Sequence, residues 1–316
     1  MSVIHFENVS KQYAQMGHTA VADATFAVAE GSFVVLLGPS GCGKTTLLKM
    51  VNRLIEPTSG VIYLDGQDSR AIDATTLRRQ IGYVIQQVGL FPHMTVAENV
   101  AVVPDLLKWS KADIAARVDE MLALVDLPPA QYRDRYPVQL SGGQQQRVGV
   151  ARALAGDPMV ILMDEPFGAV DAITRTGLQD ALLQLQRRLH KTILFVTHDV
   201  EEALRLADKM VVMKDGRVHQ YDTPFNILKN PANDFVRELV GADDMVRQLG
   251  LIRVKAAMQP LPPDFTRNGQ PTIAQDDSLR QALSLLLGDG VTSLVVTDGA
   301  EPVGVLTLRQ IQQYRE

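Results

Sequence analysis

The sequence has little cysteine, few aromatic residues and no long hydrophobic run. Its single cysteine, Cys42, excludes an internal disulfide and agrees with a reducing compartment. The longest apolar runs, such as residues 33–37, are far shorter than the roughly 18 residues that span a bilayer, so no transmembrane helix is expected. The first residues do not combine a basic stretch with an apolar one, so no secretion signal is expected. We therefore expect the protein to stay in the cytoplasm.

Charge and composition narrow the class of protein further. The net charge of -5 and the pI of about 5.7 argue against a protein that binds nucleic acid over its whole surface. Hydrophobic residues make up 46% and charged residues 21%, which excludes disordered, collagen-like and coiled-coil chains. Because single cores stop growing at about 250 to 300 residues, a chain of 316 residues predicts a main domain and a smaller one.

The hydrophobic pattern predicts an α/β fold with a parallel sheet. Short apolar runs alternate with longer stretches of helical periodicity, which is typical of parallel strands joined by helices. Strands are predicted at 4–9, 33–37, 81–85, 160–163, 193–196 and 210–213, and helices from about 45, at 172–190 and at 200–207.

Changes in this pattern predict the domain boundaries. The pattern is only helical between residues 95 and 126, which predicts a helical subdomain of about 88–155 inside a main domain of 1–242. Prolines and glycines without periodicity predict a linker at 243–270. The tail, 271–316, alternates strand, helix, strand, strand and helix, with a candidate N-cap at Ser278, and predicts a small α+β domain.

A glycine-rich segment follows the strand at 33–37. Residues 38–45, Gly-Pro-Ser-Gly-Cys-Gly-Lys-Thr, fit the phosphate-loop pattern G-x-x-x-x-G-K-[ST]. Glycines let backbone amides converge on a phosphate, and the helix that follows offers its positive N-terminal end. Lys44 is then expected to neutralise the β- and γ-phosphates of a nucleotide, and the Thr45 hydroxyl to bind Mg²⁺. The position between a predicted strand and a predicted helix disfavours the alternative, an ordinary glycine turn.

Two carboxylates, Asp164 and Glu165, follow the apolar strand at 160–163. Beside a phosphate loop, one carboxylate at the tip of a buried strand can hold Mg²⁺ and a second can orient the attacking water. The alternative is a strand that ends in a solvated acidic turn, and the pair alone does not decide between the two.

A second glycine pair lies at 140–144, Leu-Ser-Gly-Gly-Gln, before a predicted helix at about 145–155. It is a second anion cradle for the same phosphates, which suggests a site shared between two copies of the chain. Together and in this order, the three motifs resemble those of the ATP-binding cassette (ABC) ATPase family, whose signature is this Leu-Ser-Gly-Gly-Gln run. The resemblance implies ATP and Mg²⁺ as cofactors and a P-loop NTPase fold.

The resemblance also implies further site residues. Tyr13 matches the aromatic residue that stacks on adenine, with a half-buried core tyrosine as the alternative. Gln86 matches the glutamine that contacts Mg²⁺ and the attacking water, and its neighbour Gln87 leaves this assignment ambiguous by one residue. Asp171 matches the aspartate that communicates across the dimer. His198 matches the histidine that contacts the γ-phosphate.

The resemblance thus gives three sets of candidate residues. The catalytic set contains Glu165 as general base, with Lys44, Gln86 and His198. The Mg²⁺ set contains Thr45, Gln86 and Asp164. The nucleotide-binding set contains Tyr13, Gly38, Pro39, Ser40, Gly41, Cys42, Gly43, Lys44, Thr45, Thr46, Ser141, Gly142, Gly143, Gln144 and Asp171.

Within the phosphate loop, Cys42 is interpreted as a small space-filling residue rather than a redox switch.

Segments outside these motifs resemble the quaternary-amine branch of ABC importers, which take up glycine betaine, choline or carnitine. The similarity spans about residues 1–242 and is carried by 89–96, 108–110, 136–137 and 230–236. The resemblance implies a head-to-tail homodimer that works with a separate membrane permease and an extracytoplasmic substrate-binding protein. It also implies that this chain is peripheral on the cytoplasmic face of the inner membrane and has no nucleic-acid partner. Because aromatic faces hold quaternary ammonium groups and this chain is only 5% aromatic, substrate specificity is expected in the partner proteins.

The tail from about residue 271 resembles one cystathionine-beta-synthase-type (CBS) module, and most of the resemblance lies in 289–306. Relatives often carry two such modules, which pair to form a ligand cleft. Three hypotheses follow for a single module: it steadies the dimer, it regulates the ATPase through a nucleotide or ionic strength, or it is a remnant.

Two other functions stay open. One is the ATPase of an importer for another solute class, such as polyamines or sugars. The other is a soluble ABC ATPase without a transport role. The ribosome-factor type normally holds two cassettes in one chain, and the DNA-repair type has a long coiled coil between the phosphate loop and the strand-end aspartate. This chain has one cassette and no heptad pattern between Lys44 and Asp164, which disfavours both.

Overall fold

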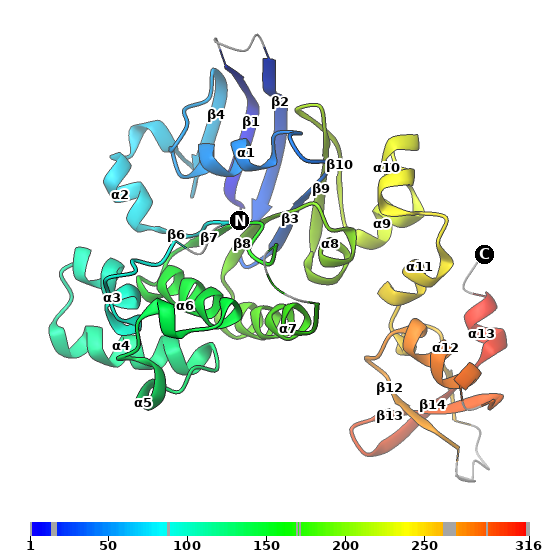
Figure 1. The fold of residues 1–316 in the computed structure, drawn as a ribbon. Coiled ribbons are helices and arrows are strands. Elements are labelled where there is room, and N and C mark those ends of the chain that lie inside the picture. The colour runs from blue at the N-terminus through cyan, green and yellow to red at the C-terminus, as the bar shows by residue number, and fades with distance from the viewer. Residues whose placement is uncertain are drawn as a thin grey trace. The chain divides into compact units, whose positions relative to one another are not determined.

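The computed structural model describes residues 2–13, 18–86, 89–168, 170, 172–261, 270–288 and 290–313. The chain forms two compact units, Met1–Thr223 and Pro224–Glu316, each described by itself below (Figure 1). The boundary therefore differs from the one expected near residue 242. The reason is that α9 (Pro224–Lys229) packs against α10 (Asp234–Val240) and α11 (Met245–Leu251), so these short helices belong to the second unit.

The first unit is built around a six-stranded sheet with the order β10-β9-β3-β8-β7-β6. Every neighbouring pair is parallel except β10 and β9, which form an antiparallel hairpin. The central strands β3, β7 and β8 are buried at every residue, which is typical of a parallel sheet covered on both faces. The strands are β3 (Phe33–Leu37), β6 (Ile81–Val84), β7 (Val160–Asp164), β8 (Thr192–Thr197), β9 (Lys209–Lys214) and β10 (Arg217–Asp222).

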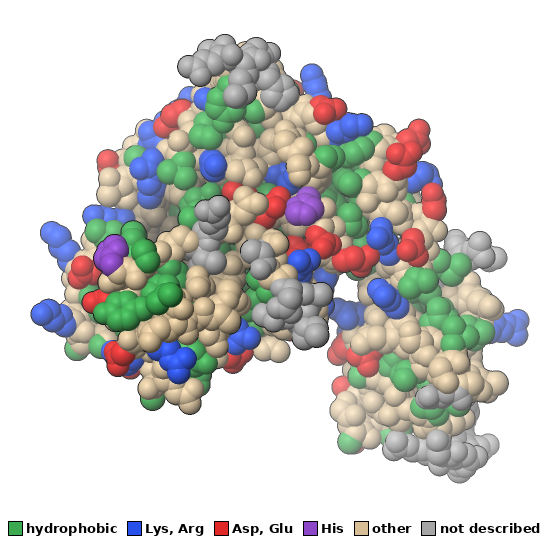
Figure 2. Space-filling view, viewed as in Figure 1, with side chains coloured by type: hydrophobic (Ala, Val, Ile, Leu, Met, Phe, Trp, Pro, Cys, Tyr) green, Lys and Arg blue, Asp and Glu red, His purple; other side chains and the backbone are tan. Residues whose placement is uncertain are grey.

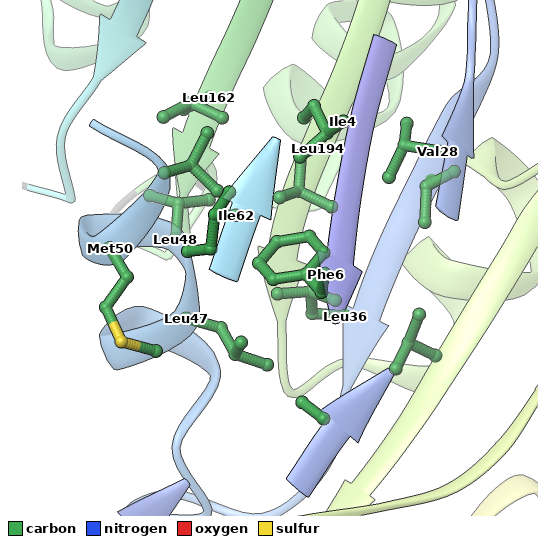
Figure 3. Packing of buried hydrophobic residues seen from close by; sticks show 14 of the residues in the cluster. Ile4, Phe6, Val28, Leu36, Leu47, Leu48, Met50, Ile62, Leu162 and Leu194 are labelled. Atoms are coloured by element: carbon green, nitrogen blue, oxygen red, sulfur yellow. The ribbon is translucent and has the colours of Figure 1, made fainter. Parts of the chain in front are cut away.

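A second, antiparallel sheet packs against this one in the same unit. Its order is β2 (His18–Ala29), β1 (Ser2–Tyr13), β4 (Ser59–Leu64) and β5 (Gln67–Asp68). The core between the sheets is apolar: Phe6 and Ile62 lie near Leu36 and Leu194 in Figure 3, and Phe6 stacks on Phe26 with ring centroids 4.3 Å apart. Each such side chain contributes about 1.5 to 3 kcal/mol by leaving water, so this core holds the phosphate loop on a rigid base.

The helices of the first unit fall into two groups. The first covers the sheets: α1 (Lys44–Val51), η1 (Ser69–Ala71), α2 (Ala74–Arg79), α7 (Ala172–Leu189) and α8 (Val200–Leu206). The second lies together in Figure 1 and fills the segment expected to be helical: α3 (Val96–Leu106), α4 (Lys111–Leu124), α5 (Pro129–Tyr132), η2 (Pro137–Gln139) and α6 (Gly142–Ala155). Side-chain caps at Thr95 and Ser110 fix the starts of α3 and α4. Within the described residues, no helix combines the length and the hydropathy needed to cross a membrane.

The second unit contains a small sheet with the order β11-β14-β13-β12. The segment expected as a linker, 243–270, is not a bare linker, because Leu249 and Val254 are buried in the same core as Leu279 and Leu294. The expected N-cap at Ser278 is present, since its Oγ accepts a hydrogen bond from the N–H of Gln281 at 3.3 Å. Besides α9 to α11, the elements are η3 (Val254–Ala256), β11 (Gln259–Pro260), β12 (Thr272–Ala274), α12 (Leu279–Gly288), β13 (Ser293–Asp298), β14 (Glu301–Thr307) and α13 (Leu308–Gln313).

Candidate functional site

The glycines of the phosphate loop stand where a side chain would not fit. Gly43 precedes α1 with φ 105°, and a Cβ there would lie 2.2 Å from the carbonyl oxygen of Ala20. A Cβ on Gly38 would lie 2.2 Å from the carbonyl oxygen of Met213. Gly41 also has positive φ, 79°, but no atom lies within 4 Å of its would-be Cβ. The loop is therefore held closely against the two sheets on one side and is open at Gly41, which fits a phosphate group.

Lys44 is buried inside this loop, at 4% exposure. Its Nζ donates hydrogen bonds to the carbonyl oxygens of Gly38 at 2.7 Å and Pro39 at 2.9 Å, and it lies 3.9 Å from the Cys42 sulfur. Burial raises the pKa of the Cys42 thiol, and the nearby ammonium only partly offsets this effect. The loop thus holds the Lys44 side chain at its centre beside a buried thiol.

Thr45 and Asp164 meet where α1 begins and β7 ends. The Thr45 hydroxyl donates to Oδ1 of Asp164 at 2.8 Å. Burial raises the pKa of the Asp164 carboxyl, while the Thr45 hydrogen bond acts in the opposite direction. Among the described residues no group of three or more His, Cys, Asp or Glu side chains could hold a metal ion. A hydroxyl and one carboxylate do fit Mg²⁺, which commonly takes one or two protein oxygens and completes its shell with phosphate and water.

Glu165 lies between two other predicted catalytic residues. Its Oε1 is 3.2 Å from Nδ1 of His198, and its Oε2 accepts from Nε2 of Gln86 at 3.3 Å. The three residues follow β7, β8 and β6, which are neighbours in the parallel sheet, so their carboxyl ends share one edge. On the face shown in Figure 2, acidic side chains gather beside a histidine. The arrangement provides a carboxylate that can take a proton, flanked by an amide and an imidazole that can orient a substrate.

The backbone of Glu165 is strained. Its φ is 44°, a left-handed conformation that non-glycine residues rarely adopt and that costs about 1 to 3 kcal/mol. Two backbone hydrogen bonds hold it there: its N–H donates to the carbonyl of Val196 at 3.0 Å, and its carbonyl accepts from the N–H of Gly168 at 3.2 Å. These two hydrogen bonds fix the direction in which the Glu165 backbone leaves β7.

The segment 141–144 forms a closed turn at the start of α6. Ser141 Oγ accepts from the N–H of Gln144 at 3.3 Å, and Gln144 Oε1 accepts from the N–H of Ser141 at 3.0 Å. Nε2 of Gln144 donates to the Tyr132 hydroxyl at 3.2 Å. No described residue of this turn is hydrogen-bonded to the phosphate loop, and Figure 1 shows α6 among α3, α4 and α7 rather than beside α1. One chain therefore does not bring its two anion cradles together.

Tyr13 stands at the end of β1 and is 36% exposed. The Lys11 ammonium lies 5.4 Å from its ring centroid. The stacking role stays a prediction, with a half-buried core tyrosine as its alternative. The predicted residue Asp171 and the competing residue Gln87 lie outside the described residues.

Sequence reasoning missed Asn99 on α3. It is fully buried: its Oδ1 accepts from the N–H of Phe91 at 2.8 Å, and its Nδ2 lies within 3.1 Å of the carbonyl oxygens of Phe91, Met94 and Thr95. It therefore fixes the segment 91–95 that leads into α3. Its position on the same helix face as Val96 and Val100, which are buried, indicates a buried polar side chain that needs hydrogen-bond partners.

Comparison with known proteins identifies the family. A family model described as ABC transporter matches residues 21–168, and one described as CBS domain matches 263–316. A carnitine transport ATP-binding protein of Listeria monocytogenes, OpuCA, is 50% identical over 99% of this chain and 77% of its own length. The chain belongs to the ABC transporter ATP-binding family. The ABC fold and the C-terminal CBS domain expected from the sequence are thereby confirmed, and the first unit of this ABC protein is an ATP-binding domain.

Two other ABC proteins illustrate the extent of the likeness. The glycine betaine/carnitine/choline transport ATP-binding protein OpuCA of Bacillus subtilis is 48% identical over 99% of this chain and 80% of its own length. The solved structure of the ATP-binding cassette MJ0796, a dimer in a post-hydrolysis state bound to ADP and phosphate, is similar with a TM-score of 0.63 and 35% identity. That likeness covers 70% of this chain and 98% of the solved one.

Proposed function

We propose that this chain is the ATP-hydrolysing subunit of an ABC importer for a quaternary-amine osmoprotectant, namely glycine betaine, choline or carnitine. The observation that carries the ATPase activity is the position of Glu165 between Gln86 and His198, next to the contact of Thr45 with Asp164. The solute class is supported by relatives with 48% to 50% identity over nearly the whole chain, whose names state carnitine, choline or glycine betaine transport.

Hydrolysis follows from the roles of these side chains. Lys44 and the loop amides bind the β- and γ-phosphates. Glu165 takes the proton of the attacking water as the water oxygen bonds to the γ-phosphorus, while the bond from that phosphorus to the β–γ bridging oxygen breaks and ADP leaves with the bonding electrons. The Gln86 amide, bonded to Glu165, orients that water. His198 is held at Nδ1 by Glu165, so its Nε2 is the nitrogen left to face the γ-phosphate. Thr45, Asp164 and Gln86 would hold Mg²⁺, which would supply positive charge against the phosphates when bound.

The active form we propose is a head-to-tail homodimer. The turn at 141–144 of one copy would cover the ATP held by the phosphate loop of the other, with Asp171 at the interface. Two observations support this arrangement: the two cradles lie apart within one chain, and the solved relative MJ0796 is dimeric. The Tyr13 ring stacks on the adenine in this proposal.

The partners we propose are a membrane permease and an extracytoplasmic substrate-binding protein, with this chain on the cytoplasmic face of the inner membrane and no nucleic acid bound. Figure 2 shows hydrophobic side chains at the surface over α3 and α4, and Phe91 and Leu106 in this region are 41% and 53% exposed. An exposed apolar area beside the Gln86 loop fits a helix of the permease.

Within the second unit, the tail from about residue 271 is proposed to steady the dimer. The hypothesis of regulation by a nucleotide or ionic strength makes a different prediction, because removal of the unit would then change how ATPase activity depends on salt or added nucleotide. The remnant hypothesis predicts no change in either dimer formation or regulation.

The test is uptake of labelled betaine, choline and carnitine, with sugars and polyamines as unrelated solutes. Cells that contain the permease and binding protein are compared with and without this chain, and with the Glu165→Gln variant. We expect uptake of one or more quaternary amines that requires Glu165. Uptake of a polyamine or sugar alone would favour the other importer class.

A further inference from the structure

A buried polar cluster lies behind the strand end that carries His198. Its centre is Glu202 on α8, which is only 6% exposed. One carboxylate oxygen accepts from the Thr197 hydroxyl at 2.7 Å, and the other accepts from Nε2 of Gln179 at 3.3 Å. Nε of Arg175 lies 4.0 Å from that second oxygen. A buried carboxylate is costly unless it is paired and hydrogen-bonded, so this cluster is a built feature of the fold.

Arg175 extends the cluster to two more segments. One guanidinium nitrogen lies 3.4 Å from Oδ2 of Asp199, and the other donates to the carbonyl oxygen of Val170 at 3.1 Å. Val170 belongs to the loop that begins at Glu165. Arg175 and Gln179 are one turn apart on α7, so a single helix face reaches both the loop after β7 and the loop after β8.

These contacts hold both chain neighbours of His198. Thr197 precedes it and donates to Glu202, while Asp199 follows it, caps α8 and contacts Arg175. The His198 side chain itself is 57% exposed, so packing restricts it little, and its place depends on the backbone around it and on its contact with Glu165. Burial raises the pKa of the Glu202 carboxyl, and the Thr197 hydroxyl and Arg175 oppose this shift. The ionised form of Glu202 therefore depends on those partners.

We propose that Arg175 and Glu202 are positioning residues for ATP hydrolysis, which set His198 against Glu165 and couple this position to the loop after β7. The inference rests on the proposed ATPase function. Neither residue touches the reacting atoms. They act by fixing Thr197 and Asp199, so their loss should lower turnover while ATP binding at the phosphate loop stays intact.

The kinetic test uses the full chain. In Arg175→Ala we expect kcat to fall about tenfold to a hundredfold, since moving a catalytic group by about 1 Å costs up to about 10²-fold in rate. The affinity for a fluorescent ATP analogue should change by about twofold or less. Arg175→Lys should recover part of the loss, because an ammonium can pair with Asp199 or Glu202. The matched control is Arg187→Ala, an exposed arginine near the end of the same helix, which should keep the parent kcat.

A double-variant cycle then identifies the path. If the cluster acts through His198, Arg175→Ala should add little to the loss already caused by His198→Ala. Losses that multiply would overturn the proposal, as would an unchanged kcat in both Arg175→Ala and Glu202→Gln. Glu202→Gln keeps the side-chain shape, so its effect does not depend on a cavity.

A measurement without turnover separates this inference from the proposed function. In the chain with ¹³C-labelled histidine, His198→Ala identifies the His198 imidazole resonance. We expect Arg175→Ala and Glu202→Gln to shift that resonance, and Arg187→Ala to leave it in place. A parent chain without ATPase activity but with these shifts would refute the proposed function alone. An unmoved His198 resonance in both cluster variants would refute the positioning role whatever the activity.

Discussion

Replacement of Asn99 by alanine should remove the hydrogen bonds that hold the segment 91–95 before α3. The side chain offers one acceptor and two donor hydrogens, and all three are used within that segment. Each hydrogen bond contributes about 1 kcal/mol net, so Asn99→Ala should lower the free energy of unfolding of the first unit by about 3 kcal/mol. For a unit of this size, that corresponds to a melting temperature lower by about 6 to 12 °C.

Thermal unfolding followed by circular dichroism measures this loss. The control is Asp105→Ala, an exposed position on the same helix, for which we expect a change within about 0.5 kcal/mol. Asn99→Asp should be worse than Asn99→Ala at neutral pH, because the carboxylate would face the carbonyl oxygens that now accept hydrogen bonds. The reasoning would be refuted by an Asn99→Ala chain that melts together with the Asp105→Ala chain.

The same substitution has a functional consequence under the proposed transport role. The segment that Asn99 holds carries Phe91, part of the apolar surface proposed for the permease. At a temperature where the variant is folded, we expect ATPase activity of the isolated chain to be retained and uptake by the assembled importer to fall. Equal losses of both activities would place the effect of Asn99 in the catalytic site instead.

Three other outcomes follow from the site and the fold. Glu165→Gln should keep ATP binding and lower the turnover rate by about 10²- to 10⁴-fold. An ATP-bound dimer should then be detected by size-exclusion chromatography. Near-normal phosphate release by this variant would contradict the general-base role. Burial raises the Asp164 pKa above the ordinary value of about 3.9, so the ionised carboxylate costs folded-state stability at neutral pH. Asp164→Asn should therefore have a higher melting temperature than the parent at neutral pH. The difference should shrink as pH falls through the raised pKa, because the parent carboxyl then becomes protonated. A pH-independent difference would point to packing instead. A chain that ends after Thr223 should stay folded and bind ATP. A chain that ends after Gln270 should be protease-sensitive, because it keeps Leu249 but loses Leu279 from the core that the two share. Equal protease resistance of the two chains would argue against a boundary between the units at Thr223.

The parts of the site that could be predicted from sequence are those fixed by local rules. Glycines that need positive φ mark the phosphate loop, and apolar runs that end in polar residues mark Asp164 and His198. Because parallel strands end at one edge of a sheet, the strand order alone brings Glu165, Gln86 and His198 together.

The remaining features depend on contacts between segments far apart in sequence. Gln179 and Glu202 meet because α7 and α8 pack together, and no periodicity in either helix records that pairing. The linker prediction at 243–270 gave too much weight to the prolines at its end. Leu249 and Val254 precede those prolines, and only packing against Leu279 and Leu294 shows that they belong to a core.

The closed turn at 141–144 bears on how fast two copies could associate. Its serine and glutamine are hydrogen-bonded to each other, and the glutamine also to Tyr132, so the turn is ordered within a single chain. A contact surface that is ordered before encounter loses little conformational entropy on docking. Under the proposed dimer, the association rate would then depend on nucleotide charge at the opposing phosphate loop and on salt, rather than on slow folding of the turn.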